Sequence, residues 1–286
     1  MQTTGRRLKM FYSGIADEAG KTIEEQIRAH QELGWEHLEL RTVEGESIAR
    51  LADDKFAEIA GKLKAGHIQV SCFASKLGDW SRPISGDFAE DIKDMRMAIP
   101  RMKEMGTSFI RAMSWPNAGW SDEDWKKEAI RRMQELVRLA EEGGVTIVHE
   151  NCSGWGGRPE TCRELVETIA SPHFKILYDT GNPPAHGQDA WEFYQTVRPY
   201  IAYVHIKDCL NGGGLGKETY TFCGEGEGKV EDTLRHLLEN GYEGGISIEP
   251  HLIHVIHDKS KDDREKDPFQ AYVEYGRRLA HIIHNL

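Results

Sequence analysis

The stretch VTIVHEN, residues 145–151, is a short apolar run that ends in a histidine and a glutamate. A run rich in β-branched residues is typical of a buried β-strand, because such side chains pack well on a pleated surface. A carboxylate at the end of a buried strand is costly unless it is paired or binds a cation. The position of Glu150 therefore raises the question of which fold and which neighbours accommodate it.

Strand-like runs of this kind alternate with amphipathic helical segments along the whole chain. The runs cover residues 9–16, 37–41, 68–74, 107–113, 145–151, 174–180, 202–208 and 244–250. The helical segments cover residues 22–34, 47–66, 87–106, 122–144, 158–170, 189–200, 229–241 and 267–284. Eight strand-then-helix units predict an α/β fold, a (β/α)8 TIM barrel, with a single domain over residues 1–286. The alternative is an open doubly wound sheet, but no glycine-rich phosphate loop follows any of these runs.

The composition narrows the class of protein. The chain has 286 residues and a formal net charge of −11, and an acidic chain repels polyphosphate, so we expect no nucleic-acid partner. Its five cysteines are scattered without a CxxC pair, which favours a reducing compartment over a disulfide framework. The N-terminal segment lacks the apolar stretch of a signal peptide, and no run reaches the length of a membrane span. We therefore expect a cytoplasmic protein without membrane contact.

The alternation of side chains along the last four strands predicts which of them meet inside the barrel. Along VTIVHEN, His149 belongs to the apolar set that should face the helices, and the residue after it belongs to the inward set. The last inward residues of four consecutive strands are Glu150, Asp179, His205 and Glu249. These positions converge at the C-terminal face of a barrel, where active sites lie. One acidic residue at a strand end is commonly only a cap or a solvated group, but four in matching phase predict a site for one divalent ion. Mn²⁺, Mg²⁺ or Co²⁺ suits these ligands best, and Zn²⁺ is a further option, since crowded carboxylates without a cation would repel one another.

Five short strings carry a resemblance to a known family. HEN at 149–151, YDTGN at 178–182, HIKD at 205–208, GEGE at 224–227 and SIEPH at 247–251 resemble the xylose isomerase-like TIM-barrel family of sugar isomerases and epimerases. The segment 24–40 also resembles its first helix and second strand. The resemblance implies that Glu150, Asp179, His205 and Glu249 are the metal ligands, and it suggests a homodimer or a homotetramer. Members include ketose 3-epimerases, hydroxypyruvate isomerases, inosose and dehydroshikimate dehydratases, and a branch of AP endonucleases.

The reaction expected from such a site starts from one intermediate. A divalent ion can chelate the carbonyl oxygen and the adjacent hydroxyl of a sugar or keto-polyol and stabilise the enediolate. Glu150 and Glu249 would flank this carbohydrate-like substrate as general base and acid. Returning the proton gives epimerisation or isomerisation, which is the leading expectation, and loss of a β-hydroxyl gives a lyase, which is the alternative. An AP endonuclease, which needs more histidines and a basic surface, is a remote alternative, and a metal-free binding protein would not need these ligands.

Two departures from the ketose 3-epimerase pattern concern the substrate. Asn182 stands where those enzymes carry a substrate-binding histidine three residues after the metal aspartate, and His186 lies further on. Gly156 stands where they carry a second glutamate. Asn182 and His186 remain candidates for substrate contact, but a free ketose is less strongly indicated.

Three basic residues near the strand ends could bind substrate oxygens. Lys207 could contact the substrate, or it could pair with Asp208 or Glu225. Arg111 and Lys76 could clamp a carboxylate or a phosphate, or they could pair with nearby acids.

The remaining candidates each have a structural alternative. Glu39 could bond a substrate hydroxyl or form a salt bridge with a nearby arginine. Trp115 and Trp155 could line a sugar pocket or pack in the core. The histidines at 251, 254 and 257 have a spacing that could indicate a second metal, but we favour a loop after the last strand, with His251 near the substrate.

Overall fold

The computed structural model describes residues 10–212, 219–253 and 267–286. Its main sheet has eight parallel strands in the order β1-β12-β9-β8-β7-β6-β5-β2. A parallel bridge between Ile15 and Glu39 links the two ends of this order and nearly closes the sheet. The strands are Phe11–Gly14 (β1), His37–Leu40 (β2), Gln69–Leu77 (β5), Phe109–Ser114 (β6), Thr146–Gly154 (β7), Phe174–Asp179 (β8), Ile201–Ile206 (β9) and Gly245–Ile248 (β12). The predicted (β/α)8 barrel is confirmed.

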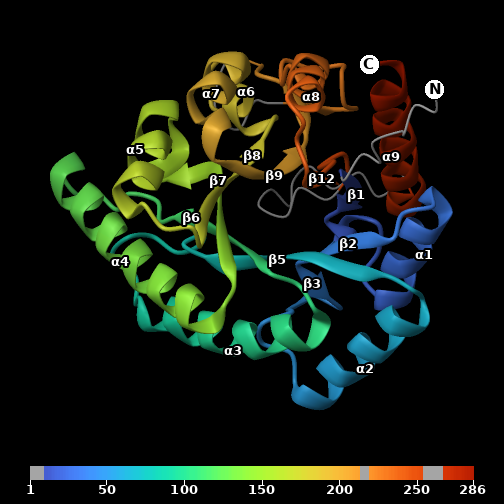
Figure 1. Ribbon diagram of the computed structural model, residues 1–286, viewed down its shortest axis with the longest axis horizontal. Coiled ribbons are helices and arrows are strands. Elements are labelled where there is room, and N and C mark those ends of the chain that lie inside the picture. The colour runs from blue at the N-terminus through green and yellow to red at the C-terminus, as the bar shows by residue number, and fades with distance from the viewer. Residues whose placement is uncertain (1–9, 213–218, 254–266) are drawn as a thin grey trace, which may run out of the picture.

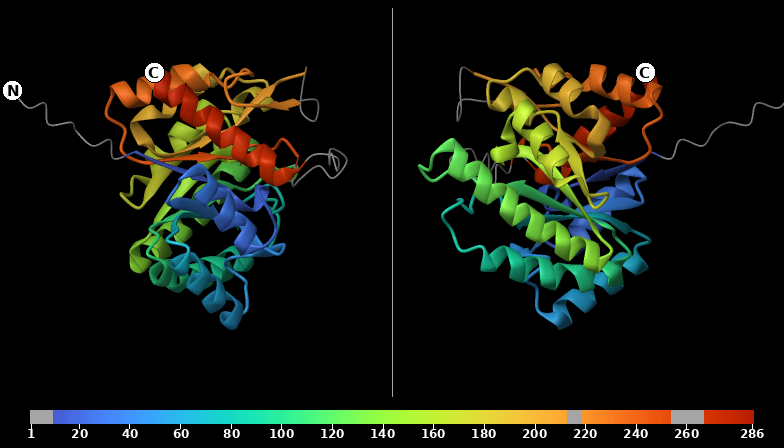
Figure 2. Two further views of the ribbon diagram at one scale, coloured as in Figure 1. Left: turned by 90° about the vertical axis from the view of Figure 1, so that its right-hand side faces the viewer. Right: turned by 60° about the vertical axis from the view of Figure 1, so that its left-hand side comes forward.

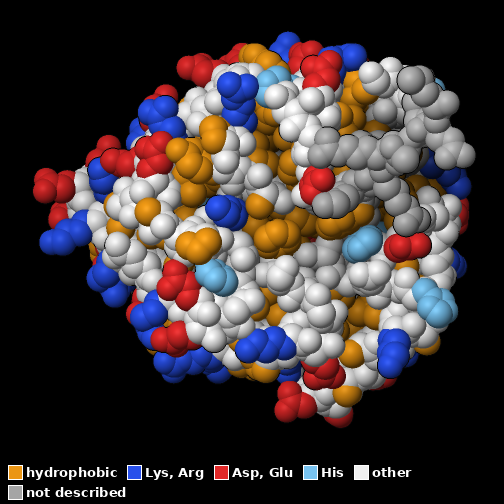
Figure 3. Space-filling model, in the orientation of Figure 1, with side chains coloured by type: hydrophobic (Ala, Val, Ile, Leu, Met, Phe, Trp, Pro, Cys, Tyr) orange, Lys and Arg blue, Asp and Glu red, His pale blue; other side chains and the backbone are white. Residues whose placement is uncertain are grey.

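The helices follow one another in chain order around the outside of the barrel (Figure 1). The longer ones are Ile23–Leu33 (α1), Asp53–Ala65 (α2), Ala89–Met105 (α3), Asp122–Gly143 (α4), Pro159–Ile169 (α5), Ala190–Val197 (α7), Val230–Glu239 (α8) and Pro268–Asn285 (α9). Figure 2 shows α4 along the outer surface, where it packs between α3 and α5. On the face shown in Figure 3, acidic and basic side chains are mixed around the rim. Within the described ranges, no helix is long and apolar enough to cross a bilayer.

Local signals in the sequence set several helix ends. Thr22 accepts a hydrogen bond from the backbone N–H of Glu25, whose side chain bonds back, so a capping box starts α1. Gly34 ends this helix with a φ of 69°, a left-handed conformation that suits glycine. The helix predicted to start at residue 47 begins at Asp53 instead, because a small hairpin of Thr42–Val43 (β3) and Glu46–Ser47 (β4) occupies the start of that segment.

Two hydrophobic clusters fill the two sides of the sheet. The larger one packs the sheet against the helices and includes Ile147, Ile176 and Val204. The smaller one consists of residues in the opposite phase, Cys72, Val148, Leu177 and Tyr203, with partly buried neighbours that include Phe11 and Phe109. Val148 and Leu177 share the inward phase of the predicted ligands. This small cluster therefore fills the barrel interior below those ligands.

Short elements surround the C-terminal ends of the strands. They are the 3-10 turns Ala16–Glu18 (η1) and Trp155–Gly157 (η2), the one-turn helix Asn182–Ala185 (α6), and the hairpin of Asp208–Leu210 (β10) and Thr219–Thr221 (β11). The carboxylate of Asp208 accepts backbone N–H bonds from Gly224, Gly226 and Gly228 at 2.8–3.0 Å. The GEGE string is therefore wound around one buried carboxylate, which ties it to the end of β9.

Candidate metal centre and substrate cavity

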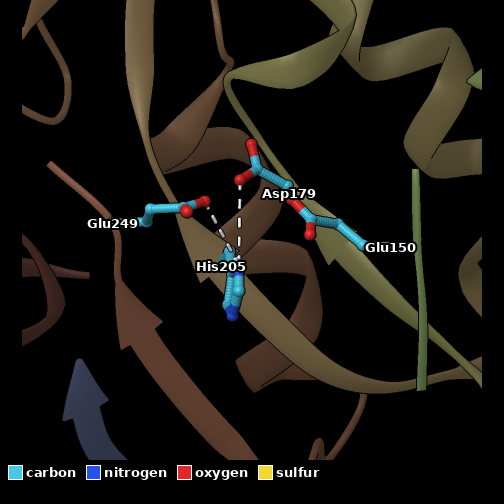
Figure 4. A group of neighbouring side chains, drawn as sticks. All are labelled: Glu150, Asp179, His205 and Glu249. Atoms are coloured by element: carbon cyan, nitrogen blue, oxygen red, sulfur yellow. Dashed lines mark ion pairs between the residues drawn. The ribbon is translucent and has the colours of Figure 1, made fainter. Parts of the chain in front are cut away.

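The four predicted ligands come together at one end of the barrel (Figure 4). Glu150 lies on β7, Asp179 ends β8, His205 lies on β9 and Glu249 directly follows β12. Asp179 and Ser247 are each in register with His205 on a neighbouring strand, so the strand ends are level with one another. One ligand atom from each of the four side chains lies within 4.8 Å of the others, and all four residues are buried.

His205 is held with one ring nitrogen pointing at the carboxylates. Its Nε2 lies 2.9 Å from Glu39 Oε2, which also accepts a hydrogen bond from Ser247 Oγ at 2.8 Å. Its Nδ1 lies 3.5 Å from Glu249 Oε2. Burial disfavours the charged ring, but Glu39 and Glu249 outweigh it and raise the pKa of His205 to about 10. A cation that binds at Nδ1 must therefore displace a proton.

The donor atoms fit a divalent metal ion. Among the described residues, His205 Nδ1 is buried without a hydrogen-bond partner, and Glu150 Oε2 and Asp179 Oδ2 have only the ion pairs with Arg111 and Lys207. A buried polar atom is rarely left without a hydrogen bond, so His205 Nδ1 indicates a ligand at the point where the four side chains converge. Carboxylate oxygens with one imidazole suit Mg²⁺, Mn²⁺ or Co²⁺, and Zn²⁺ also accepts this set.

Protein cations already neutralise part of the charge of the carboxylates, contrary to the expectation from the sequence. Lys207 Nζ lies 2.9 Å from Asp179 Oδ2 and 2.9 Å from Glu249 Oε2. Arg111 Nη1 lies 3.1 Å from Glu150 Oε2. Lys207 therefore pairs with the predicted ligand carboxylates and not with the partners considered for it. The convergence of four ligand atoms within 4.8 Å of one another, more than charge repulsion, supports a metal assignment.

The two carboxylates that share Lys207 differ in acidity. Burial raises the pKa of Asp179 to about 6, although the charge of Lys207 opposes this. Burial acts in the same direction on Glu249, but the positive charges of Lys207, His251 and His205 outweigh it and hold its pKa well below the usual range. Glu249 is therefore ionised at neutral pH.

A cavity of about 750 Å³ opens at these strand ends, a size typical of small-molecule sites. Eight of the residues considered for the site from the sequence line it: Lys76, Arg111, Glu150, Asn182, His186, Lys207, Glu249 and His251. Asn182, the first residue of α6, donates from Nδ2 to Glu150 Oε1 at 3.0 Å. It thus fixes the orientation of that carboxylate at the cavity wall.

Three other predicted residues lie elsewhere. Glu39 is buried against His205, as described above, and Trp115 donates from Nε1 to Asp91 Oδ2 at 2.9 Å. Trp155 packs edge-on against Trp125 with 5.3 Å between the ring centroids. None of the three is among the described residues that line the cavity. Both tryptophans therefore occupy the packing positions that were the alternative to sugar contact.

Two further residues had little or no signal in the sequence: Arg41, which lines the cavity, and Glu18, which contacts the cavity-lining His251. Arg41 Nη1 lies 3.2 Å from Glu249 Oε1, and period-two alternation from Glu39 could have placed it on the inward face. Glu18, in the turn after β1, lies 2.9 Å from His251 Nδ1 through Oε1, and no periodic pattern marks that turn. His251 lines the cavity as expected, whereas positions 254 and 257 lie outside the described residues.

Known proteins share this architecture. The chain is 29% identical over 154 residues to a 2-epi-5-epi-valiolone 7-phosphate 2-epimerase of Actinoplanes sp., covering 50% of this chain and 54% of that protein. It is 26% identical over 176 residues to an inosose dehydratase of Clostridium tetani, covering 54% and 58%. The chain thus spans about half the length of the curated relatives it matches. The crystal structure of the IOLI protein with a zinc atom has a TM-score of 0.75 at 17% identity and covers 96% of this chain and 99% of that one.

The match to a whole family reaches further along the sequence than either of these relatives. It includes the second half of α1, all four predicted ligand positions and the start of α9. Residues 27–270 match the family described as the xylose isomerase-like TIM barrel, and the chain belongs to that family.

Proposed function

We propose that this protein is a divalent-metal-dependent isomerase or epimerase of a sugar or keto-polyol. The observation that carries the proposal is the convergence of one ligand atom each from Glu150, Asp179, His205 and Glu249 within 4.8 Å of one another, with the two glutamates lining a cavity of about 750 Å³. The relative from Actinoplanes sp. is named as a 2-epi-5-epi-valiolone 7-phosphate 2-epimerase, which supports a carbohydrate-like substrate.

The chain's own residues supply the proton chemistry. Glu249, ionised and facing the cavity, is placed to remove a proton from the carbon beside a carbonyl. Glu150 reaches the cavity from β7, held by Asn182 and by Arg111, and is placed to return a proton. Arg111 Nη1 also lies 3.8 Å from Glu249 Oε1, so one guanidinium holds both carboxylates in place. When bound, a divalent ion would act as a Lewis acid that stabilises the enediolate.

A lyase is the second candidate. The relatives from Clostridium tetani and Clostridium perfringens are named inosose dehydratases. The same pair of glutamates could remove the proton and then protonate a departing β-hydroxyl, so the two reactions share their first step.

Metal content tests the site itself. Purified protein loaded with Mn²⁺ and freed of excess should hold about one ion per chain by elemental mass spectrometry. The double variant Glu150→Gln, Glu249→Gln should hold almost none, because two charged donors are lost. Asp79→Asn, a change at a cavity carboxylate outside the cluster, is the matched control and should keep its metal. Equal metal in the double variant and the wild type would refute the site.

Deuterium incorporation tests the reaction. A panel of ketoses, their phosphate esters and inososes is incubated with the Mn²⁺-loaded enzyme in D₂O and followed by NMR. Deuterium at a carbon beside the carbonyl, without loss of water, identifies the isomerase or epimerase, and an unsaturated product identifies the lyase. If the metal-loaded enzyme incorporates no deuterium and releases no water across the panel, the proposed reaction is wrong.

A further inference from the structure

Among the described residues that line the cavity, Lys76 differs from the other cationic side chains. Arg41 and Lys207 pair with Glu249, and Arg111 pairs with Glu150. Lys76 is exposed and forms no ion pair within the described ranges. Its charge is therefore available to a ligand, whereas the other three charges already hold the catalytic carboxylates.

The backbone of β5 directs this lysine into the cavity. On β5 the register advances from Phe73 to Leu77 while β6 advances only from Ile110 to Ala112, so the strand is irregular there. Ser75, within that irregular stretch, turns toward β6 and donates from Oγ to the carbonyl oxygen of Arg111.

The two neighbours of Ser75 face the other way. Ala74 and Lys76 both line the cavity. Irregularities of this kind commonly re-aim a side chain beside an active site. The direction of the Lys76 side chain is thus set by the backbone of β5.

The same cavity offers a further hydrogen-bond donor, and the acid nearest to Lys76 along the chain is already hydrogen-bonded. Ser153 lines the cavity from β7, and its Oγ contacts only the weak acceptor Met113 Sδ, at 3.6 Å, among the described residues. Asp79 is the closest cavity-lining acid along the chain. Its Oδ1 accepts hydrogen bonds from Ser81 N at 2.9 Å and Ser81 Oγ at 2.6 Å. No ion pair between Asp79 and Lys76 forms in the described structure.

We propose that Lys76, with Ser153, binds an anionic group of the substrate, a phosphate or a carboxylate, so that the substrate is an anionic sugar or keto-polyol. The inference rests on the proposed function. Glu249 lines the cavity from the end of β12, which is not a neighbour of β5 in the sheet, and its carboxylate would repel a second anion that is not bound to a metal. The anionic group therefore lies at β5, while the reacting carbons lie at the glutamates. A lysine makes a charge-assisted hydrogen bond to such a group.

Anion binding is measured by calorimetric titration of the Mg²⁺-loaded protein with inorganic phosphate and with malonate at constant ionic strength. The variants are Lys76→Met, Lys76→Arg and, as a matched control, Lys103→Met on the exposed side of α3. Wild type and Lys103→Met should bind with the same Kd. Lys76→Met should raise Kd about tenfold or more, the loss expected for one charged hydrogen bond, and Lys76→Arg should retain most of the affinity. Tighter binding of inorganic phosphate would indicate a phosphate group on the substrate, and tighter binding of malonate would indicate a carboxylate.

Equal Kd in Lys76→Met and wild type, or no binding of either anion to the wild type, would overturn the inference. The titration needs no turnover, so its result is independent of the proposed reaction. If phosphate binds through Lys76 but no substrate exchanges deuterium, only the reaction is wrong. If a neutral ketose exchanges deuterium faster than its phosphate ester and Lys76→Met leaves both kcat/KM values unchanged, only the anion site is wrong.

Discussion

His149 and Glu150 are neighbours in the sequence with opposite environments. The ring of His149 lies beside Cys162 of α5 and near Phe174, and burial lowers its pKa to about 3. It is therefore a neutral core residue between the sheet and the helices. Glu150 points the other way, to the cavity, and its Oε1 accepts a hydrogen bond from Asn182. The one-residue shift in phase separates a packing role from a ligand role.

Glu39 affects the site through its contact with His205. It does not line the cavity, but it holds His205 Nε2 at 2.9 Å and so aims Nδ1 at the carboxylates. We expect Glu39→Gln to weaken Mn²⁺ binding about 10- to 100-fold, as changes to such supporting bonds do, because the neutral amide holds the imidazole less firmly. Calorimetry of the metal-free protein with Mn²⁺ measures this. Glu36→Gln, three residues earlier and exposed, serves as the control, and equal affinities in the two variants would show that Glu39 does not support the site.

At the scale of elements, the extension of β7 beyond its ligand depends on close contact with β6. Gly154 pairs with Ser114, and its φ is 99°. A Cβ at Gly154 would lie 2.4 Å from the backbone carbon of Ser114. The neighbouring Gly156 N–H donates to Ser114 Oγ at 2.8 Å, which begins the turn η2. This contact sets where the chain leaves the cavity wall.

Alanine variants of two glycines distinguish the cost of a left-handed backbone conformation from the cost of breaking the β6–β7 contact. Gly34 also has a positive φ, 69°, but a Cβ there would meet nothing within 4 Å. Gly34→Ala should therefore lower the free energy of unfolding by about 1–2 kcal/mol, the cost of the left-handed conformation alone. Gly154→Ala should lower it by at least about 2 kcal/mol more, because the backbone of Ser114 must move. Urea unfolding of both variants measures the difference, and equal losses would mean that the β6–β7 contact relaxes freely.

At the scale of the whole molecule, the four predicted ligands come from strands that lie side by side in the order β12, β9, β8 and β7. An ion bound by all four would therefore tie half of the barrel wall together. The homodimer or homotetramer and the cytoplasmic location stay predictions from the sequence.

Metal binding should stabilise the entire fold. An ion that binds only the native state adds about 2.7 kcal/mol to the free energy of unfolding at one hundred times its Kd. We expect the Tm of wild-type protein to rise with Mn²⁺ and to fall back with a chelator. The Tm of the double variant Glu150→Gln, Glu249→Gln should change neither with Mn²⁺ nor with the chelator. Scanning calorimetry measures Tm in each case. A chelator-sensitive Tm in that variant would place the ion elsewhere.

The sequence alone determined the barrel and the four converging side chains. Both follow from local periodicity, because alternation along each strand assigns Glu150 and Asp179 to the inward phase, and closure of the sheet brings inward positions together. Only the tertiary structure decided the partners. Glu39 and His205 meet across 166 positions of sequence, and Lys207 contacts Asp179 and Glu249 on neighbouring strands. Such contacts depend on how strands that are far apart in the chain are aligned with one another, and no local sequence pattern encodes that alignment.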